Sequence, residues 1–282
     1  MSFQNERYFK ELLSGEGFTF KKSLGQNFII DPFVCPKMAE FAADGETGVI
    51  EIGPGAGVLT RSLSETAKKV VAVEIDERLK PVLKKSLEGC DNVKVIFGDI
   101  LKTDINKLIS EEFAGFEKVN ICANLPYYIT SPIIMGILKM KPDIGSLTAM
   151  VQKEAAQRIC AEVGSRNAGA VTVAVDYYSE ASVLFEVSRN CFMPAPKVDS
   201  AVINLKIRKE PKVEVKSEEF FFKVAKSLFA QRRKTLLNSV SSTLKIDKSV
   251  ISSALKNMGL DESIRGEKLT IEQIAEFSNL IQ

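Results

Sequence analysis

A series of short apolar runs, each followed by glycine, an acidic residue or an amide, constrains the fold of this 282-residue chain most strongly. Apolar runs of about four to eight residues bounded by turn residues are typical of strands buried in a parallel sheet. The runs interpreted in this way are 49–52, 69–76, 93–97, 119–123 and 146–152. Segments with helical periodicity separate them. This alternation predicts an α/β fold with a mostly parallel, Rossmann-like sheet.

The pattern changes in the last third of the chain. Residues 183–187 and 201–207 are predicted to be antiparallel edge strands, whereas 170–177 fits a helix or a strand equally well. From Glu210 onward the periodicity is helical, with helices expected over 220–229, 248–258 and 270–280. We therefore expect two domains, a catalytic domain over 1–209 and a small helical domain over 210–282.

Composition excludes several classes of chemistry. The chain has no histidine, which rules out Ser-His-Asp and Cys-His catalysis. Its five cysteines are isolated and show no C-x-x-C spacing, so we expect no metal site and a reducing compartment. No apolar run is as long as a membrane span, and the first ten residues lack the apolar stretch of a signal peptide. These features predict a cytoplasmic protein without a membrane segment.

The first strand leads into a glycine-rich loop that carries Glu51, Gly53 and Gly55. Glycines let the backbone approach a ligand closely, as in nucleotide-binding βα units. The spacing G-x-G-x-G departs from the dinucleotide fingerprint, and Glu51 would repel a pyrophosphate. A negatively charged loop instead suits a ligand with a cationic amino group or a sulfonium.

Acidic side chains follow the next two strands. Glu74 stands 21 residues after Gly53, where a carboxylate can accept hydrogen bonds from a ribose. Asp99 could accept from an adenine amino group while Ile100 packs on the ring. Each acid alone is more readily explained as a loop cap. Polar groups at four successive strand ends, the last of them Asn124, favour a shared ligand site.

The fourth strand ends in Asn124-Leu125-Pro126-Tyr127. Pro126 cannot donate to a strand ladder and forces Leu125 into an extended conformation, so the chain turns there. We interpret the turn as a grip for a planar base that carries an amino group. The alternative is a loop corner in which Tyr127 only packs. The proline-stiffened loop 191–200 presents Phe192 as a possible second wall for the base.

Basic residues are unevenly distributed although the formal net charge is only +2. Residues 206–245 contain eleven Lys or Arg against four Glu, which is typical of a polyanion-binding surface. The alternative is an ordinary solvated face. The candidate nucleic-acid contacts are Lys21, Lys22, Lys197, Arg232, Arg233 and Lys234.

Together these motifs resemble the rRNA adenine N6-dimethyltransferases, and most closely the KsgA-type small-subunit branch of that family. The segments that carry the resemblance are 24–28, 51–55, Glu74, 98–101, 124–127, 192–200 and 232–234. They occur in the family's order between about residues 20 and 240. Residues 167–170 lack the Tyr-Gly pair expected in the family, and Ile29 replaces a leucine.

The resemblance implies a class I methyltransferase fold and S-adenosylmethionine as methyl donor. The implied donor contacts are Gln26, Asn27, Ile29, Glu51, Gly53, Gly55, Glu74, Ile75, Asp99, Ile100 and Asn124. The implied catalytic residues are Asn124, Leu125, Pro126, Tyr127 and Phe192. The family methylates two adjacent adenines near the 3′ end of small-subunit (16S) rRNA, so the expected partner is the immature 30S particle. We also expect the protein to be a monomer.

Other functions remain open at the level of sequence. A macrolide-resistance-type enzyme would act on 23S rRNA with a similar catalytic domain. A non-catalytic ribosome assembly factor could retain the fold without turnover. Methylation of DNA adenine or of a protein glutamine also uses Asn-Pro turns, but the basic helical segment favours structured RNA.

Overall fold

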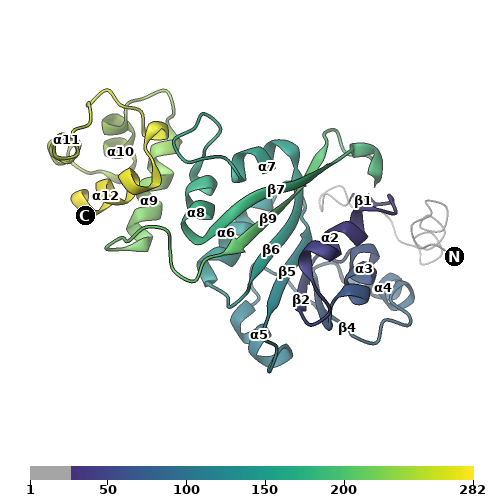
Figure 1. Cartoon of the computed structure of the whole chain (residues 1–282). Helices are drawn as coiled ribbons and strands as arrows, with labels where there is room; N and C mark the ends of the chain where they lie inside the picture. The colour runs from purple at the N-terminus through teal and green to yellow at the C-terminus, as the bar shows by residue number, and fades with distance from the viewer. Residues whose placement is uncertain (1–26) are drawn as a thin grey trace. The chain divides into compact units, whose positions relative to one another are not determined.

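The computed structural model describes residues 27–282, so the predictions for Lys21, Lys22 and Gln26 fall outside the described part. The larger of its two sheets has seven strands in the order β4-β3-β2-β5-β6-β9-β7 (Figure 1). The strands are β2 (Gly48–Ile52), β3 (Lys69–Glu74), β4 (Val93–Phe97), β5 (Val119–Asn124), β6 (Ser146–Gln152), β7 (Ser179–Val187) and β9 (Ser200–Ile207).

The predicted mostly parallel sheet is confirmed. β2 pairs in parallel with β3 and β5, β3 with β4, and β5 with β6, while β9 is antiparallel to β6. β9 is not an edge strand, because β7 follows it at the margin of the sheet. The chain leaves β2 toward β3 and leaves β5 toward β6, so the strand order reverses between β2 and β5. Open α/β sheets bind ligands at such a reversal.

Helices precede, connect and follow the parallel strands. They are α2 (Val34–Ala42), α3 (Val58–Thr66), α4 (Lys80–Ser86), α5 (Ile105–Glu112), α6 (Thr130–Met140) and α7 (Lys153–Ile159). Right-handed crossovers place α3 and α4 on one face of the sheet and α5 and α6 on the other. Contacts of α2 with α3 and of α5 with α6 agree with this division. The sheet is therefore covered on both faces, which explains its continuous apolar strands.

A second, two-stranded pairing joins distant parts of the chain. β1 (Phe28–Ile29) runs antiparallel to β8 (Phe192–Met193), so Ile29 lies opposite Phe192. Phe28 packs in a cluster with Leu79, Val82 and Leu83. This pairing fixes the first described residues next to the ends of the sheet strands.

The described residues form two compact units, one of 27–156 with 182–207 and one of 157–181 with 208–282. The sheet belongs to the first unit, apart from the first residues of β7. The second unit contains 157–181 in addition to the C-terminal helices, a segment that the sequence analysis assigned to the first domain. That segment includes α8 (Ala170–Tyr178), the stretch for which periodicity did not separate helix from strand.

The second unit is helical, as its periodicity predicts. Its other helices are α9 (Glu218–Ala230), α10 (Leu236–Leu244), α11 (Lys248–Asn257) and α12 (Ile271–Ile281). Phe221 and Phe277 are fully buried in its core. Thr270 and Gln273 form the expected capping box at the start of α12.

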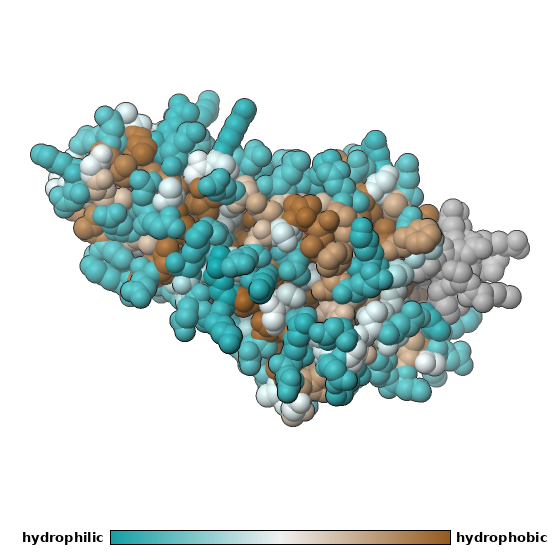
Figure 2. Space-filling model, in the orientation of Figure 1, coloured by the Kyte–Doolittle hydropathy of each residue, from teal (hydrophilic) through white to brown (hydrophobic). Residues whose placement is uncertain are grey.

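None of the helices among residues 27–282 is long and apolar enough to cross a membrane. On the face drawn in Figure 2, hydrophilic side chains cover most of the surface.

Candidate active site

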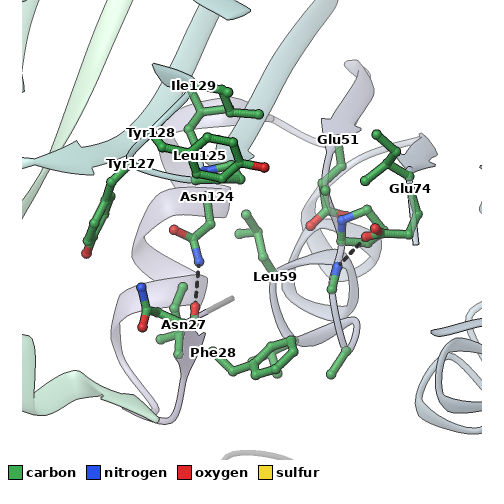
Figure 3. Close-up of a pocket in the computed structure, with 18 residues that line it drawn as sticks. Asn27, Phe28, Glu51, Leu59, Glu74, Asn124, Leu125, Tyr127, Tyr128 and Ile129 are labelled. Carbon is green, nitrogen blue, oxygen red and sulfur yellow. Dashed lines mark hydrogen bonds between the residues drawn. The ribbon is translucent and has the colours of Figure 1, made fainter. Parts of the chain in front are cut away.

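A pocket in the first unit lies where β2, β3 and β5 end, at the reversal of strand order (Figure 3). The predicted residues that line it are Asn27, Ile29, Glu51, Gly53, Gly55, Glu74, Ile75, Asn124, Leu125, Pro126 and Tyr127. Figure 3 shows Asn124 between Tyr127 on one side and Glu51 and Glu74 on the other. The pocket thus has an acidic half and a half bordered by an aromatic ring.

The glycine loop takes a conformation that other residues rarely adopt. Gly53 and Gly55 have φ angles of +70° and +58°. A Cβ atom at Gly55 would lie 2.9 Å from Cε1 of Phe28, so a side chain there would displace that ring. The Gly55 N–H donates to Glu74 Oε2 at 3.1 Å, which ties the loop to the neighbouring strand. The loop is therefore shaped for close approach of a ligand.

Glu51 is a buried acid with unused hydrogen-bonding capacity. It is 1% exposed, and its Oε2 atom has no hydrogen-bond partner within residues 27–282. Burial, together with the nearby negative charge of Glu74, raises the pKa of the Glu51 carboxyl to about 8. A cationic group in the pocket would supply both a partner and a compensating charge, which fits the prediction of a cationic ligand.

Glu74 is buried and already anchored. Its Oε1 accepts from the Asp76 N–H at 2.8 Å while Oε2 accepts from Gly55. Burial raises the pKa of this carboxyl above its ordinary value. The anchoring fixes the direction of the carboxylate, and its remaining lone pairs are suited to vicinal hydroxyl groups. Ile75 beside it is 58% exposed and presents an apolar face.

Asp99 and Ile100 are not among the residues that line this pocket. The turn that carries them is linked to it, because the Gly98 N–H donates to the Glu74 carbonyl at 2.8 Å. Asp99 accepts from the Leu101 N–H at 3.0 Å, and Ile100 is buried. Their predicted contact with an adenine remains a prediction.

Hydrogen bonds from backbone groups of the turn after β5 to neighbouring elements hold this turn in place. The Leu125 N–H donates to the Met150 carbonyl of β6 at 3.1 Å, and the Pro126 carbonyl accepts from Thr130 Oγ1 at 3.1 Å. The Asn124 amide nitrogen donates to the Asn27 carbonyl at 3.4 Å (Figure 3). An amide nitrogen can only donate, so Oδ1 is the Asn124 atom that can accept from a substrate, and the bond from Nδ2 to Asn27 fixes the orientation of the amide.

Tyrosines border the same turn. The Tyr127 hydroxyl lies 2.7 Å from Ser200 Oγ of β9, and burial raises the pKa of its phenol. Tyr128 also lines the pocket and is 58% exposed.

Phe192 does not offer its ring as a second wall for a base in this structure. It is 3% exposed and packs among core residues such as Met38 and Leu63. Its alternation in β8 directs it into the core, a consequence of pairing with Ile29 that the loop sequence does not reveal. Lys197 of the same loop is exposed.

The basic triplet 232–234 follows α9 in the second unit, and its first member has internal partners. Arg232 Nη2 donates to the carbonyls of Arg166 and Ala168 at 2.9 and 2.7 Å, and Nε donates to Glu267 at 2.9 Å. Arg233 and Lys234 are exposed. Arg232 thus connects three segments of this unit, a role that the sequence analysis did not anticipate.

Several residues of the pocket were missed. They are Phe28, Pro54, Ala56, Val58, Leu59, Tyr128 and Ile129. All are sequence neighbours of predicted residues, so the only available signal was proximity to a motif.

A seven-stranded, mostly parallel sheet with a late antiparallel strand and a pocket at its reversal defines the fold of the class I methyltransferases. A family profile described as "Ribosomal RNA adenine dimethylase" matches residues 17–282. The chain belongs to this family of rRNA adenine dimethyltransferases.

Curated relatives agree. A "Ribosomal RNA small subunit methyltransferase A" of Geobacillus sp. (strain WCH70) is 48% identical over 97% of this chain and 95% of its own length. The protein of the same name from Listeria monocytogenes is 49% identical over 96% of this chain and 94% of its own length.

Solved structures place the fold in the same group. The 23S rRNA methyltransferase ErmE superposes with a TM-score of 0.66 at 28% identity and covers 90% of this chain and 99% of its own. A dimethyladenosine transferase from Plasmodium falciparum superposes with a TM-score of 0.71 at 26% identity, over 89% of this chain and 95% of its own. The protein is therefore an enzyme that uses a methyl donor to modify adenine in rRNA.

Proposed function

We propose that this enzyme uses S-adenosylmethionine to dimethylate N6 of two adjacent adenines near the 3′ end of small-subunit (16S) rRNA, in the immature 30S particle. It acts as a cytoplasmic monomer. The observation that carries the proposal is the oriented Asn124 amide, whose Oδ1 is directed to a substrate by the bond from Nδ2 to Asn27. Relatives at 46–49% identity that are named for the small subunit support this choice over 23S rRNA.

The donor fits the acidic half of the pocket. When bound, S-adenosylmethionine supplies an electrophilic methyl group on a positively charged sulfur. Glu51 provides a carboxylate for the cationic groups of the donor, and Glu74 accepts from the ribose hydroxyls. Ile75 packs against the adenine ring, with Asp99 and Ile100 completing that end of the site. The unpartnered Oε2 of Glu51 supports this fit.

The other half of the pocket holds the target base. The lone pair of an adenine amino group is delocalised into the ring, so the group is a poor nucleophile until it is oriented. Asn124 Oδ1 and the Leu125 carbonyl accept hydrogen bonds from the N–H groups of the adenine amine, while Tyr127 stacks on the extruded ring. Because the methylated amine is acidic, it loses its proton to water, and the chain needs no histidine.

Docking of the RNA falls to the basic residues. Arg233, Lys234 and Lys197 are exposed and can contact phosphates, while Arg232 acts mainly through the segments it joins. Phosphate contacts of this kind position the RNA without reading its sequence.

Methylation of immature 30S particles with labelled donor, followed by mass spectrometry of the 16S rRNA, tests the proposal. We expect dimethyladenosine at two adjacent positions near the 3′ end. Asn124→Ala should lower the transfer rate at saturating donor by at least about hundredfold. Transfer to naked 23S rRNA but not to the 30S particle would favour the macrolide-resistance type. RNA binding without transfer would favour an assembly factor.

A further inference from the structure

Ser200 contacts the catalytic turn from outside the pocket. Its Oγ lies 2.7 Å from the Tyr127 hydroxyl, and one of the two groups donates to the other. Ser200 is fully buried and is not among the residues that line the pocket. It begins β9, two strands away from the strand that ends in Asn124.

The backbone on both sides of this contact is fixed. Ser200 pairs with Gln152 of β6, and the preceding Asp199 carbonyl accepts from the Lys153 N–H at 3.0 Å. On the other side, Leu125 and Pro126 are held by hydrogen bonds to β6 and to the start of α6. The remaining freedom of Tyr127 is therefore rotation of its side chain.

A hydrogen bond at the tip of the ring restricts that rotation. The ring is half-buried, so its packing alone leaves part of its surface open to solvent. A bond from the phenol to a rigid strand selects one ring orientation before any base arrives. Groups that must be aligned for reaction gain rate from such preorganisation.

We propose that Ser200 is a positioning residue for methyl transfer, and that its hydroxyl holds the Tyr127 ring in the plane on which the target adenine stacks. This inference rests on the proposed function. Ser200 touches neither the donor nor the base. Its effect passes entirely through the Tyr127 hydroxyl, which makes the two residues testable as a pair.

The test is a double-mutant cycle on full-length protein, with single-turnover transfer to 30S particles at saturating donor and RNA. Tyr127→Phe and Ser200→Ala each delete the same hydrogen bond while Tyr127→Phe keeps a ring for stacking. We expect each variant to lower the rate about tenfold, and the double variant also about tenfold, because only one interaction is lost. Rates that multiply to about a hundredfold would overturn the proposal, as would a Ser200→Ala rate equal to that of the wild type.

Donor affinity separates positioning from simple damage to the fold. S-adenosylmethionine affinity should stay within about twofold of the wild type in Ser200→Ala, since Ser200 lies outside the pocket. Ser86→Ala is the matched control, because Ser86 is 1% exposed and its hydroxyl donates to the Leu83 carbonyl of its own helix, while its backbone carbonyl, which accepts from Arg61, is kept in the variant. Equal losses of donor affinity and transfer rate in Ser200→Ala would refute a positioning role.

Failure of the two proposals can be told apart. A wild-type protein that transfers no methyl group to 16S rRNA refutes the proposed function. An active wild type with independent effects of Tyr127→Phe and Ser200→Ala refutes only the role of Ser200. Tyr127→Phe changes a residue with solvent access, so the cycle keeps an informative arm even if the Ser200 variant folds poorly.

Discussion

Among individual side chains, the buried carboxyl of Glu51 has the clearest energetic consequence. An acid that is 1% exposed and lacks a partner for one oxygen within residues 27–282 holds its proton to a higher pH than an exposed acid, and a compensating positive charge favours its release. Deprotonation and binding of a cationic donor are then coupled. The negative charge of Glu51 at high pH lowers the free energy of unfolding of the donor-free protein. The same charge raises the affinity for a cationic donor.

We expect S-adenosylmethionine affinity to rise between about pH 6 and pH 8 and to level off above, because the pKa of Glu51 is raised to about 8. The rise is at most about tenfold per pH unit, and binding below pH 8 should release a proton. Calorimetric titration in buffers of different ionisation enthalpy measures both. Glu51→Gln should flatten the profile; a wild-type affinity independent of pH would contradict the assignment.

The stability of the donor-free protein should move in the opposite direction. The pKa of Glu51 is about 8 in the folded chain against an ordinary value of 4.5, so the folded state binds more protons between these values. Its free energy of unfolding therefore falls as the pH rises through this window. Urea denaturation at several pH values should show a smaller fall for Glu51→Gln.

Strand ends and the turns after them carry most of the site. The glycine loop after β2 and the turn after β5 are local features, and the sequence predicts both because Gly, Pro and Asn have strong conformational preferences. The burial of Phe192 and the internal hydrogen bonds of Arg232 depend on Ile29 and Glu267, residues far away in the chain. No local signal reports such partners.

Gly55→Ala should be more costly than Gly89→Ala. Both glycines have positive φ angles, +58° and +81°, so both variants incur backbone strain of about 1 kcal/mol. Only at Gly55 would a Cβ meet a neighbour, the Phe28 ring at 2.9 Å. We expect a larger loss of unfolding free energy and weaker donor binding for Gly55→Ala, measured by denaturation and titration. Equal effects at the two positions would show that the Phe28 contact relaxes freely.

Arg232→Lys should destabilise the protein by about 1 kcal/mol, although it preserves the charge, because the single ammonium nitrogen of lysine cannot stand in for both Nε and Nη2 of the planar guanidinium. Arg233→Lys is the matched control, since Arg233 is exposed, and should change stability by less than about 0.5 kcal/mol. Thermal denaturation compares the two. Similar melting temperatures would mean that the Arg232 bonds contribute little.

At the scale of the whole molecule, the described residues divide into a sheet unit, which holds the pocket, and a helical unit. The parallel sheet, its order of elements and the turn after β5 were predictable because each strand and turn is encoded over a few residues. The composition of the second unit was not, because 157–181 joins it through packing of α8 with α9 and α12. Apolar periodicity identifies a buried face but not the element that covers it.

Affinity for 16S rRNA should fall steeply with salt, since exposed basic residues such as Arg233 and Lys234 would release counterions from phosphates. Arg233→Ala and Lys234→Ala should each reduce the slope of log affinity against log salt by about 1. Filter binding at several salt concentrations measures the slope. A slope that neither variant changes would exclude these side chains as phosphate contacts.

Because the second unit is built from two separate stretches of the chain, it affects folding during translation and the design of protein fragments. During translation, α8 is synthesised well before α9 and α12. The apolar residues Val173, Ala174 and Tyr177, which are buried in the folded unit, therefore stay exposed until the C-terminal helices have been synthesised. A truncation after residue 209 would leave that apolar face permanently without its cover and prone to aggregation. A separable fragment of the second unit has to include 157–181 together with 208–282, and a linker that replaces 182–207 would be needed to join them.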